Sequence, residues 1–180
     1  AQGEKTAGSQ SAVVSIFVNR RDGAPVVIDS GGGFAGAIIE RLNDNSVPHI
    51  KFNGAGSGHG RTLDSGLPFA NKRAESWWKF REALDPSKPG GSEICLPPDP
   101  EVRSDLTTPV LDTRALEQRG VIQIEAKDSI RKRIGRSPGK GDVCVMCFSE
   151  GNNAVKRALR EQSPRPAFSN VGHAAAKRRK

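Results

Sequence analysis

Residues 25–52 read PVVIDSGGGFAGAIIERLNDNSVPHIKF, and this stretch carries the clearest structural pattern in the chain. Residues 25–29 are a short apolar run that ends before glycines, which is typical of a buried strand. Apolar residues then recur at helical spacing over residues 34–43, and residues 47–52 have the composition of a second strand. The pattern predicts a βαβ unit whose two strands are parallel.

Further strands and helices alternate along the rest of the chain, which predicts an α/β domain. Residues 11–19 fit either a strand or a helix leading into a strand, and periodicity does not decide between them. A long loop rich in glycine, serine and histidine is expected over residues 53–68. The other expected elements are helices over residues 69–84, 99–106 and 127–134, a strand over residues 121–124, and a last helix opened by Ser137-Pro138.

The composition indicates a basic protein with one ordered domain. The sequence has 180 residues, with 28 Lys and Arg against 20 Asp and Glu, a net charge of +8, and an excess of this size favours a polyanionic partner such as nucleic acid. We expect residues 1–160 to form the domain and the basic residues 161–180 to be disordered. Three cysteines, a polar start and the lack of a membrane-length apolar run indicate a soluble, cytoplasmic protein.

Asp29 is the first candidate site residue, because it ends the first predicted strand and precedes Gly31-Gly32-Gly33. Open α/β sheets place their sites at the carboxyl ends of strands, where such an acid can bind a metal ion. Glycines there allow close approach of a phosphate. The alternative is that Asp29 caps the following helix. The glycines do not have the GxGxxG spacing of a dinucleotide site.

Asp142 is the second candidate, in the first turn of the last predicted helix. The helix dipole favours a carboxylate at this position for structural reasons alone. A metal site is the other reading, because Mg²⁺ is commonly bound by one or two carboxylates together with substrate phosphate oxygens. We predict that Asp29 and Asp142 converge in space as metal ligands and catalytic residues.

A dense group of cations approaches Asp142 along the chain. Such a group is either a solvated helix face or a set of contacts to backbone phosphates. We favour phosphate contacts, and the predicted DNA-binding residues are Lys127, Arg131, Arg136 and Lys140. The glycine-rich segment around Lys140 does not have the GxxxxGK[ST] spacing of a Walker A loop, so no ATPase activity is expected.

Taken in order, several short blocks of this sequence resemble the nuclease domain of phage terminase large subunits. The likeness extends over about residues 1–153, and the ordered series is specific although no single block is. The blocks are VVIDSGGG at residues 26–33, FNG at 52–54, FANKRAE at 69–75, IQIEAKD at 122–128, and GRSP at 135–138 followed by Asp142.

The resemblance implies an RNase H-like fold, in which helices flank a central mixed sheet. It implies a hydrolase, a Mg²⁺- or Mn²⁺-dependent endonuclease that cuts concatemeric double-stranded DNA during genome packaging. It also implies the terminase small subunit and the portal as partners, in a bacterial or phage-infected cell. In the family three acids hold the metals; the second matches Asp29 and the third matches Asp142.

The first acid of the family lies on a strand that would precede Ala1, so the resemblance is to an N-terminally truncated nuclease domain. Glu4 is nearby but does not match the position of that acid. Our hypothesis is that this chain alone cleaves DNA feebly or not at all. The alternatives are a non-catalytic DNA-binding remnant and another RNase H-like nuclease, such as a junction resolvase.

Overall fold

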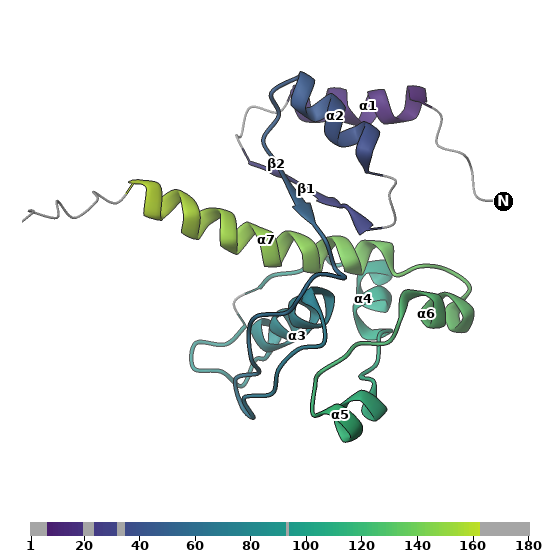
Figure 1. Cartoon of the computed structure of the whole chain (residues 1–180), viewed down its shortest axis with the longest axis vertical. Coiled ribbons are helices and arrows are strands. Elements are labelled where there is room, and N and C mark those ends of the chain that lie inside the picture. The colour runs from purple at the N-terminus through teal and green to yellow at the C-terminus, as the bar shows by residue number, and fades with distance from the viewer. Residues whose placement is uncertain (1–6, 20–23, 32–34, 93, 163–180) are drawn as a thin grey trace, which may run out of the picture.

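A computed structural model describes residues 7–19, 24–31, 35–92 and 94–162 of the chain. It confirms the α/β class, with helices and strands in alternation over the first third of the chain and helices after it (Figure 1). The described elements are α1 (Ala7–Val18), β1 (Val26–Asp29), α2 (Gly36–Asp44), β2 (His49–Phe52), α3 (Lys72–Leu84), α4 (Pro100–Thr107), α5 (Thr113–Arg119), α6 (Lys127–Ile134) and α7 (Gly139–Gln162).

The predicted βαβ unit is confirmed. Strands β1 and β2 pair in parallel, and the register places Asp29 opposite Phe52 at their carboxyl ends. Alternate β1 residues, Val26 and Ile28, are buried in a cluster with Leu42 of α2 and Val14 of α1. Residues 11–18, which fitted either a strand or a helix, belong to helix α1.

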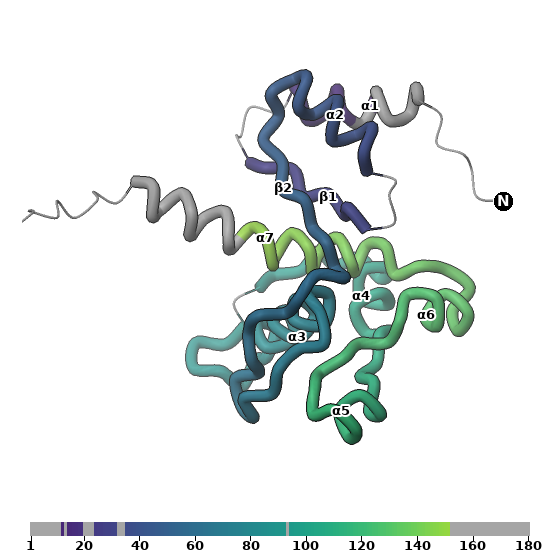
Figure 2. The backbone as a smooth tube through the Cα atoms, viewed as in Figure 1, coloured from purple at the N-terminus to yellow at the C-terminus, as the bar shows by residue number. Residues whose placement is uncertain are grey.

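Helix α7 runs through the middle of the molecule and separates two groups of elements. Strands β1 and β2, with α1 and α2, lie on one side of it, and α3 to α6 lie on the other (Figure 1). After β2 the chain crosses α7 to reach α3, as the tube in Figure 2 shows. Buried Val145 of α7 packs against Trp77 and Phe80 of α3, so the first half of α7 is the central support of the fold.

The expected loop over residues 53–68 is anchored on the start of α3. The carbonyl oxygens of Gly56 and Gly54 accept hydrogen bonds from the N–H groups of Lys72 and Arg73, at 2.7 and 2.9 Å. The Asn71 side chain caps the same helix by accepting from the N–H of Ala74. The N-terminal donors of α3 are therefore satisfied within the protein, as helix ends require.

The prediction of a strand over residues 121–124 is wrong. The segment instead makes isolated bridges, from Ile122 to Phe69 and from Ile124 to Leu111. Each partner segment contains a proline nearby, Pro68 or Pro109, which has no N–H with which to extend a ladder. Helix α5, which precedes this segment, was not predicted from the sequence.

Three other expectations concern the C-terminal tail, the cysteines and membrane-spanning segments. Helix α7 continues to Gln162, and the rest of the predicted basic tail, residues 163–180, lies outside the described residues. The three cysteines are free thiols. Over the part of the chain that the structure describes, none of the helices has the length and apolar character needed to cross a membrane.

Candidate metal and nucleic-acid site

Asp29 ends β1, at the carboxyl edge of the parallel strand pair. Its Oδ1 accepts the N–H of Gly31 at 2.9 Å, which fixes the turn that follows the strand. A Cβ atom at Gly31 would lie 3.0 Å from that oxygen, so glycine at this position leaves room for the carboxylate. The side chain keeps 38% of its surface exposed.

Asp142 lies in the first turn of α7 and is almost fully buried. The start of α7 is fixed by Asp105 of α4, whose Oδ2 accepts the N–H groups of Lys140 and Gly141 at 2.9 and 3.2 Å. Asp105 has no exposed surface, so this carboxylate caps α7 from another helix. The cap determines where Asp142 points.

Lys127, the first residue of α6, joins the two predicted acids. Its Nζ lies 3.2 Å from Oδ2 of Asp29 and 3.0 Å from Oδ2 of Asp142. The two carboxylate oxygens are therefore no more than 6.2 Å apart, the two distances added. Residues more than a hundred positions apart in the sequence thus converge on one cation.

Two residues that the sequence analysis did not assign to the site also contact Asp142. The indole Nε1 of Trp77 donates to Oδ1 of Asp142 at 3.2 Å, and the Arg73 Nε lies 3.9 Å from the same oxygen. Arg73 also donates to the carbonyl of Glu125 at 2.8 Å. Burial lowers the pKa of Arg73, and the nearby carboxylates of Asp142, Glu125 and Asp29 oppose this effect. The signal in the sequence is the i, i+4 spacing of Arg73 and Trp77, which places both on one face of α3.

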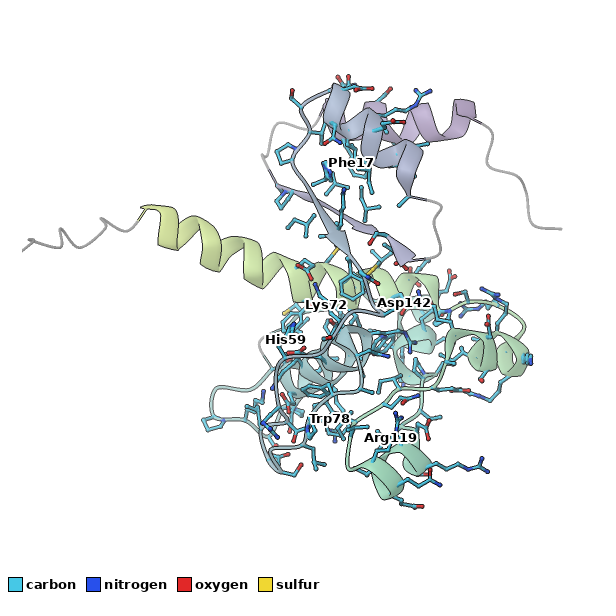
Figure 3. The ribbon with its side chains drawn as sticks, in the orientation of Figure 1. Phe17, His59, Lys72, Trp78, Arg119 and Asp142 are labelled. Carbon is cyan, nitrogen blue, oxygen red and sulfur yellow. The ribbon has the colours of Figure 1, made fainter. Side chains whose placement is uncertain are left out.

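These side chains line one cleft of about 390 Å³, which we call the acid cleft. Its charged lining residues are three carboxylates and three cations: Asp29, Asp128 and Asp142, with Arg73, Lys127 and Arg131. Figure 3 labels Asp142 near the centre of the molecule. The protein itself balances the negative charge of the cleft.

Asp29 and Asp142 fit a hard divalent cation. Both offer carboxylate oxygens, and Mg²⁺ is commonly bound by one or two carboxylates with water and substrate phosphate completing its shell. The Lys127 ammonium contacts both oxygens that such an ion would use. Asp128 also lines the cleft, but 83% of its side chain is exposed and it is paired with Arg131. Within the described ranges, no group of three or more His, Cys, Asp or Glu side chains is arranged to hold a metal.

The four predicted DNA-binding residues are all paired with carboxylates. Lys127 binds the two acids of the cleft, and Arg131 lies 3.2 Å from Asp128. Arg136 and Lys140 lie outside the acid cleft, against acids of the α4 segment. The Arg136 Nη1 is 2.5 Å from Asp105 Oδ1, and the Lys140 Nζ is 2.8 Å from Asp99 and 2.7 Å from Glu101. The pKa of Lys140 is raised by its hydrogen bonds to Asp99 and Glu101.

Comparison with protein-family models, curated proteins and solved structures gives no significant match to this chain. The acid cleft and the sequence blocks that supply its residues are therefore the features of the chain that bear on function.

Proposed function

We propose that this chain is a metal-dependent DNA endonuclease domain of the phage terminase large subunit type, acting on double-stranded DNA during genome packaging. The observation that carries the proposal is the convergence of Asp29 and Asp142 on Lys127, within hydrogen-bond distance of each. The sequence blocks that resemble the family supply Asp29, Arg73, Lys127 and Asp142, so the four residues that meet in the acid cleft come from separate blocks.

Each of these residues has a task in the proposed reaction. Asp29 and Asp142 hold Mg²⁺ or Mn²⁺, which when bound supplies a water of lowered pKa and neutralises charge on the phosphate. Trp77 keeps Asp142 in place by donating to its Oδ1, and the Arg73 guanidinium supplies a positive charge nearby. Lys127 and Arg131 line the same cleft and are suited to contact phosphate oxygens without reading sequence. Arg136 and Lys140 can join them only by exchanging their carboxylate partners for phosphate.

The proposal includes an RNase H-like fold. Its support is the parallel β1–β2 pair, with an acid at the carboxyl end of β1 and helices packed against the strands. The terminase small subunit and portal are proposed partners on the strength of the sequence resemblance.

The test is a Mn²⁺ titration of the chain with supercoiled plasmid, followed for nicking and for a gel shift together. Among the described residues, two acids of the cleft, Asp29 and Asp142, converge on one cation, so we expect weak nicking that rises with Mn²⁺. Asp142→Asn should abolish nicking and leave DNA binding intact, because it removes a metal ligand and not a phosphate contact. Asp44→Asn is the matched control, since that acid is exposed at the end of α2 and does not line the acid cleft.

Each outcome separates one alternative. A gel shift with no nicking at any Mn²⁺ concentration would support a non-catalytic DNA-binding remnant. Preference for four-way junctions over linear duplex would support a junction resolvase. Nicking that survives Asp142→Asn would remove Asp142 from the site and overturn the proposal.

A further inference from the structure

We propose that a second groove, next to the acid cleft, binds the phosphate backbone of the same DNA duplex; this inference rests on the proposed nuclease function. The groove has a volume of about 730 Å³ and lies between the end of β2, the loop after it, α3 and α7. We call it the lysine groove, because its lining includes Lys51, Lys72, Lys79 and Lys88.

A single segment of chain separates the lysine groove from the acid cleft. Phe52 and Gly54 line the acid cleft, whereas Lys51 and Asn53, their neighbours in sequence, line the lysine groove. Two consecutive residues of helix α3 also line different sites, because Arg73 lines the acid cleft and Lys72 lines the lysine groove. In the view of Figure 3, Lys72 lies between His59 of the groove and Asp142 of the cleft.

The lysine groove offers cations that are available to phosphate. Lys51 is exposed and Lys88 half-buried, and neither makes an ion pair within the described part of the chain. Lys72 is held by Glu150 and lies 5.1 Å from the centre of the Phe52 ring. The cations near the acid cleft differ, because Lys127 and Arg131 already have carboxylate partners.

The acids of the lysine groove are engaged in holding its wall. Both oxygens of Glu75 accept backbone N–H groups, from His59 and Gly60 at 2.9 Å each. Glu82 is buried and accepts from the N–H of Leu63, from Trp78 and from Lys79. These hydrogen bonds direct the carboxylates toward the 59–63 loop, so the groove lysines that make no ion pair among the described residues are Lys51 and Lys88.

The lysine groove and the acid cleft are close together, since consecutive residues line the two. Double-stranded DNA carries one phosphate charge for about every 1.7 Å of its axis. Lys72 and Arg73 are consecutive residues, with Cα atoms about 3.8 Å apart. A duplex that presents one phosphodiester to Asp29 and Asp142 has further phosphates at the spacing needed to reach the lysine groove.

The inference is tested by substituting both available lysines, Lys51→Ala with Lys88→Ala, in the full chain. The probe is a short fluorescent duplex of mixed sequence, titrated in EDTA over a range of NaCl concentrations. We expect binding to weaken by about eightfold per lysine at about 0.1 M salt, and the slope of log K against log salt to become shallower by about 1.8. The matched control is Arg103→Ala with Arg114→Ala, which removes the same charge from exposed positions on α4 and α5.

The outcomes distinguish the groove from the proposed reaction. In Mn²⁺, the lysine variant should show a raised KM for nicking with kcat little changed. A shallower salt slope in a chain that does not nick DNA would support the groove while the nuclease proposal fails. Equal affinities and slopes for the lysine variant and the wild type, with nicking intact, would overturn the groove and leave the nuclease proposal standing. Absence of duplex binding by the wild type would overturn both.

Discussion

At the scale of single residues, Lys127 controls the charge of the candidate metal site. Its ammonium contacts Asp29 and Asp142 with about a third of its side chain exposed. In Lys127→Ala the two carboxylates face each other without a shared cation. We expect the metal-free variant to lose about 1 kcal/mol of stability, a modest value because solvent screens the network. We also expect Mn²⁺ to raise the Tm of the variant more than that of the wild type, since no ammonium competes for the oxygens.

Thermal unfolding by circular dichroism, with and without MnCl₂, measures both effects of this substitution. Lys132→Ala, at an exposed position of the same helix, is the control and should leave the Mn²⁺ response unchanged. If Mn²⁺ shifts the Tm of Lys127→Ala and of the wild type equally, the lysine does not compete with a metal.

At the scale of elements, the contact between α4 and α7 positions Asp142. A Cβ at Gly141 would lie 2.9 Å from Asp105 Cβ and 3.1 Å from its carbonyl carbon, so the two helices approach closely only because residue 141 is glycine. Gly141→Ala should separate the helices and weaken the cap that Asp105 gives to α7. We expect a loss of about 1–3 kcal/mol from overpacking. Urea denaturation measures this loss.

Gly139→Ala is a matched control for this contact. Gly139 begins the same helix, and a Cβ there would meet nothing within 4 Å. We expect this variant to be as stable as the wild type or slightly more stable, because alanine favours helix over glycine. If the two alanine variants were equally stable, close packing on Asp105 would not be what fixes the start of α7.

At the scale of the whole molecule, periodicity and capping signals in the sequence predicted several of the helices and strands. They could not predict which of these elements pack against one another. The apolar spacing of residues 25–52 predicted the parallel βαβ unit that the structure contains. Helix α6 occupies the predicted residues 127–134, because its helical spacing is bounded by Gly135 in a left-handed conformation. The failed strand at residues 121–124 has suitable composition, but its neighbours cannot extend a ladder.

The two acids of the candidate site could be predicted from the sequence, but the residues that hold them could not. Asp29 and Asp142 are recognisable because each lies where an apolar segment meets a glycine-rich turn, and the structure brings them together. The spacing of Arg73 and Trp77 places both on one face of α3, but the local sequence does not encode that this face, or Asp105 of α4, packs against α7. For the same reason the sequence could not reveal that Arg136 and Lys140 pair with acids of the α4 segment.

The stability of the whole molecule should fall in acid, because several carboxylates have pKa values below their usual range. Burial of Glu82 favours its neutral form, but hydrogen bonds from Lys79, Leu63 and Trp78 outweigh this effect and lower its pKa. Hydrogen bonds from Lys140 and Arg133 lower the pKa of Asp99 and of Glu125, respectively. A pKa that is lower in the folded state than in the unfolded state stabilises the fold above the unfolded value. This contribution is lost as the pH falls from about 4.5 through the folded pKa.

Glu82→Gln tests the contribution of the buried carboxylate of Glu82 to this pH dependence. Glutamine keeps the shape of the side chain but not the charge that three donors contact, so we expect a loss of about 1–2 kcal/mol at neutral pH. Urea denaturation of both proteins from neutral pH into acid should give curves that converge as the wild-type carboxylate becomes protonated. Glu117→Gln, at an exposed position of α5, should follow the wild type throughout. Curves for Glu82→Gln and the wild type that stay parallel down to the lowest pH would mean that ionisation of Glu82 does not contribute to the pH dependence of stability.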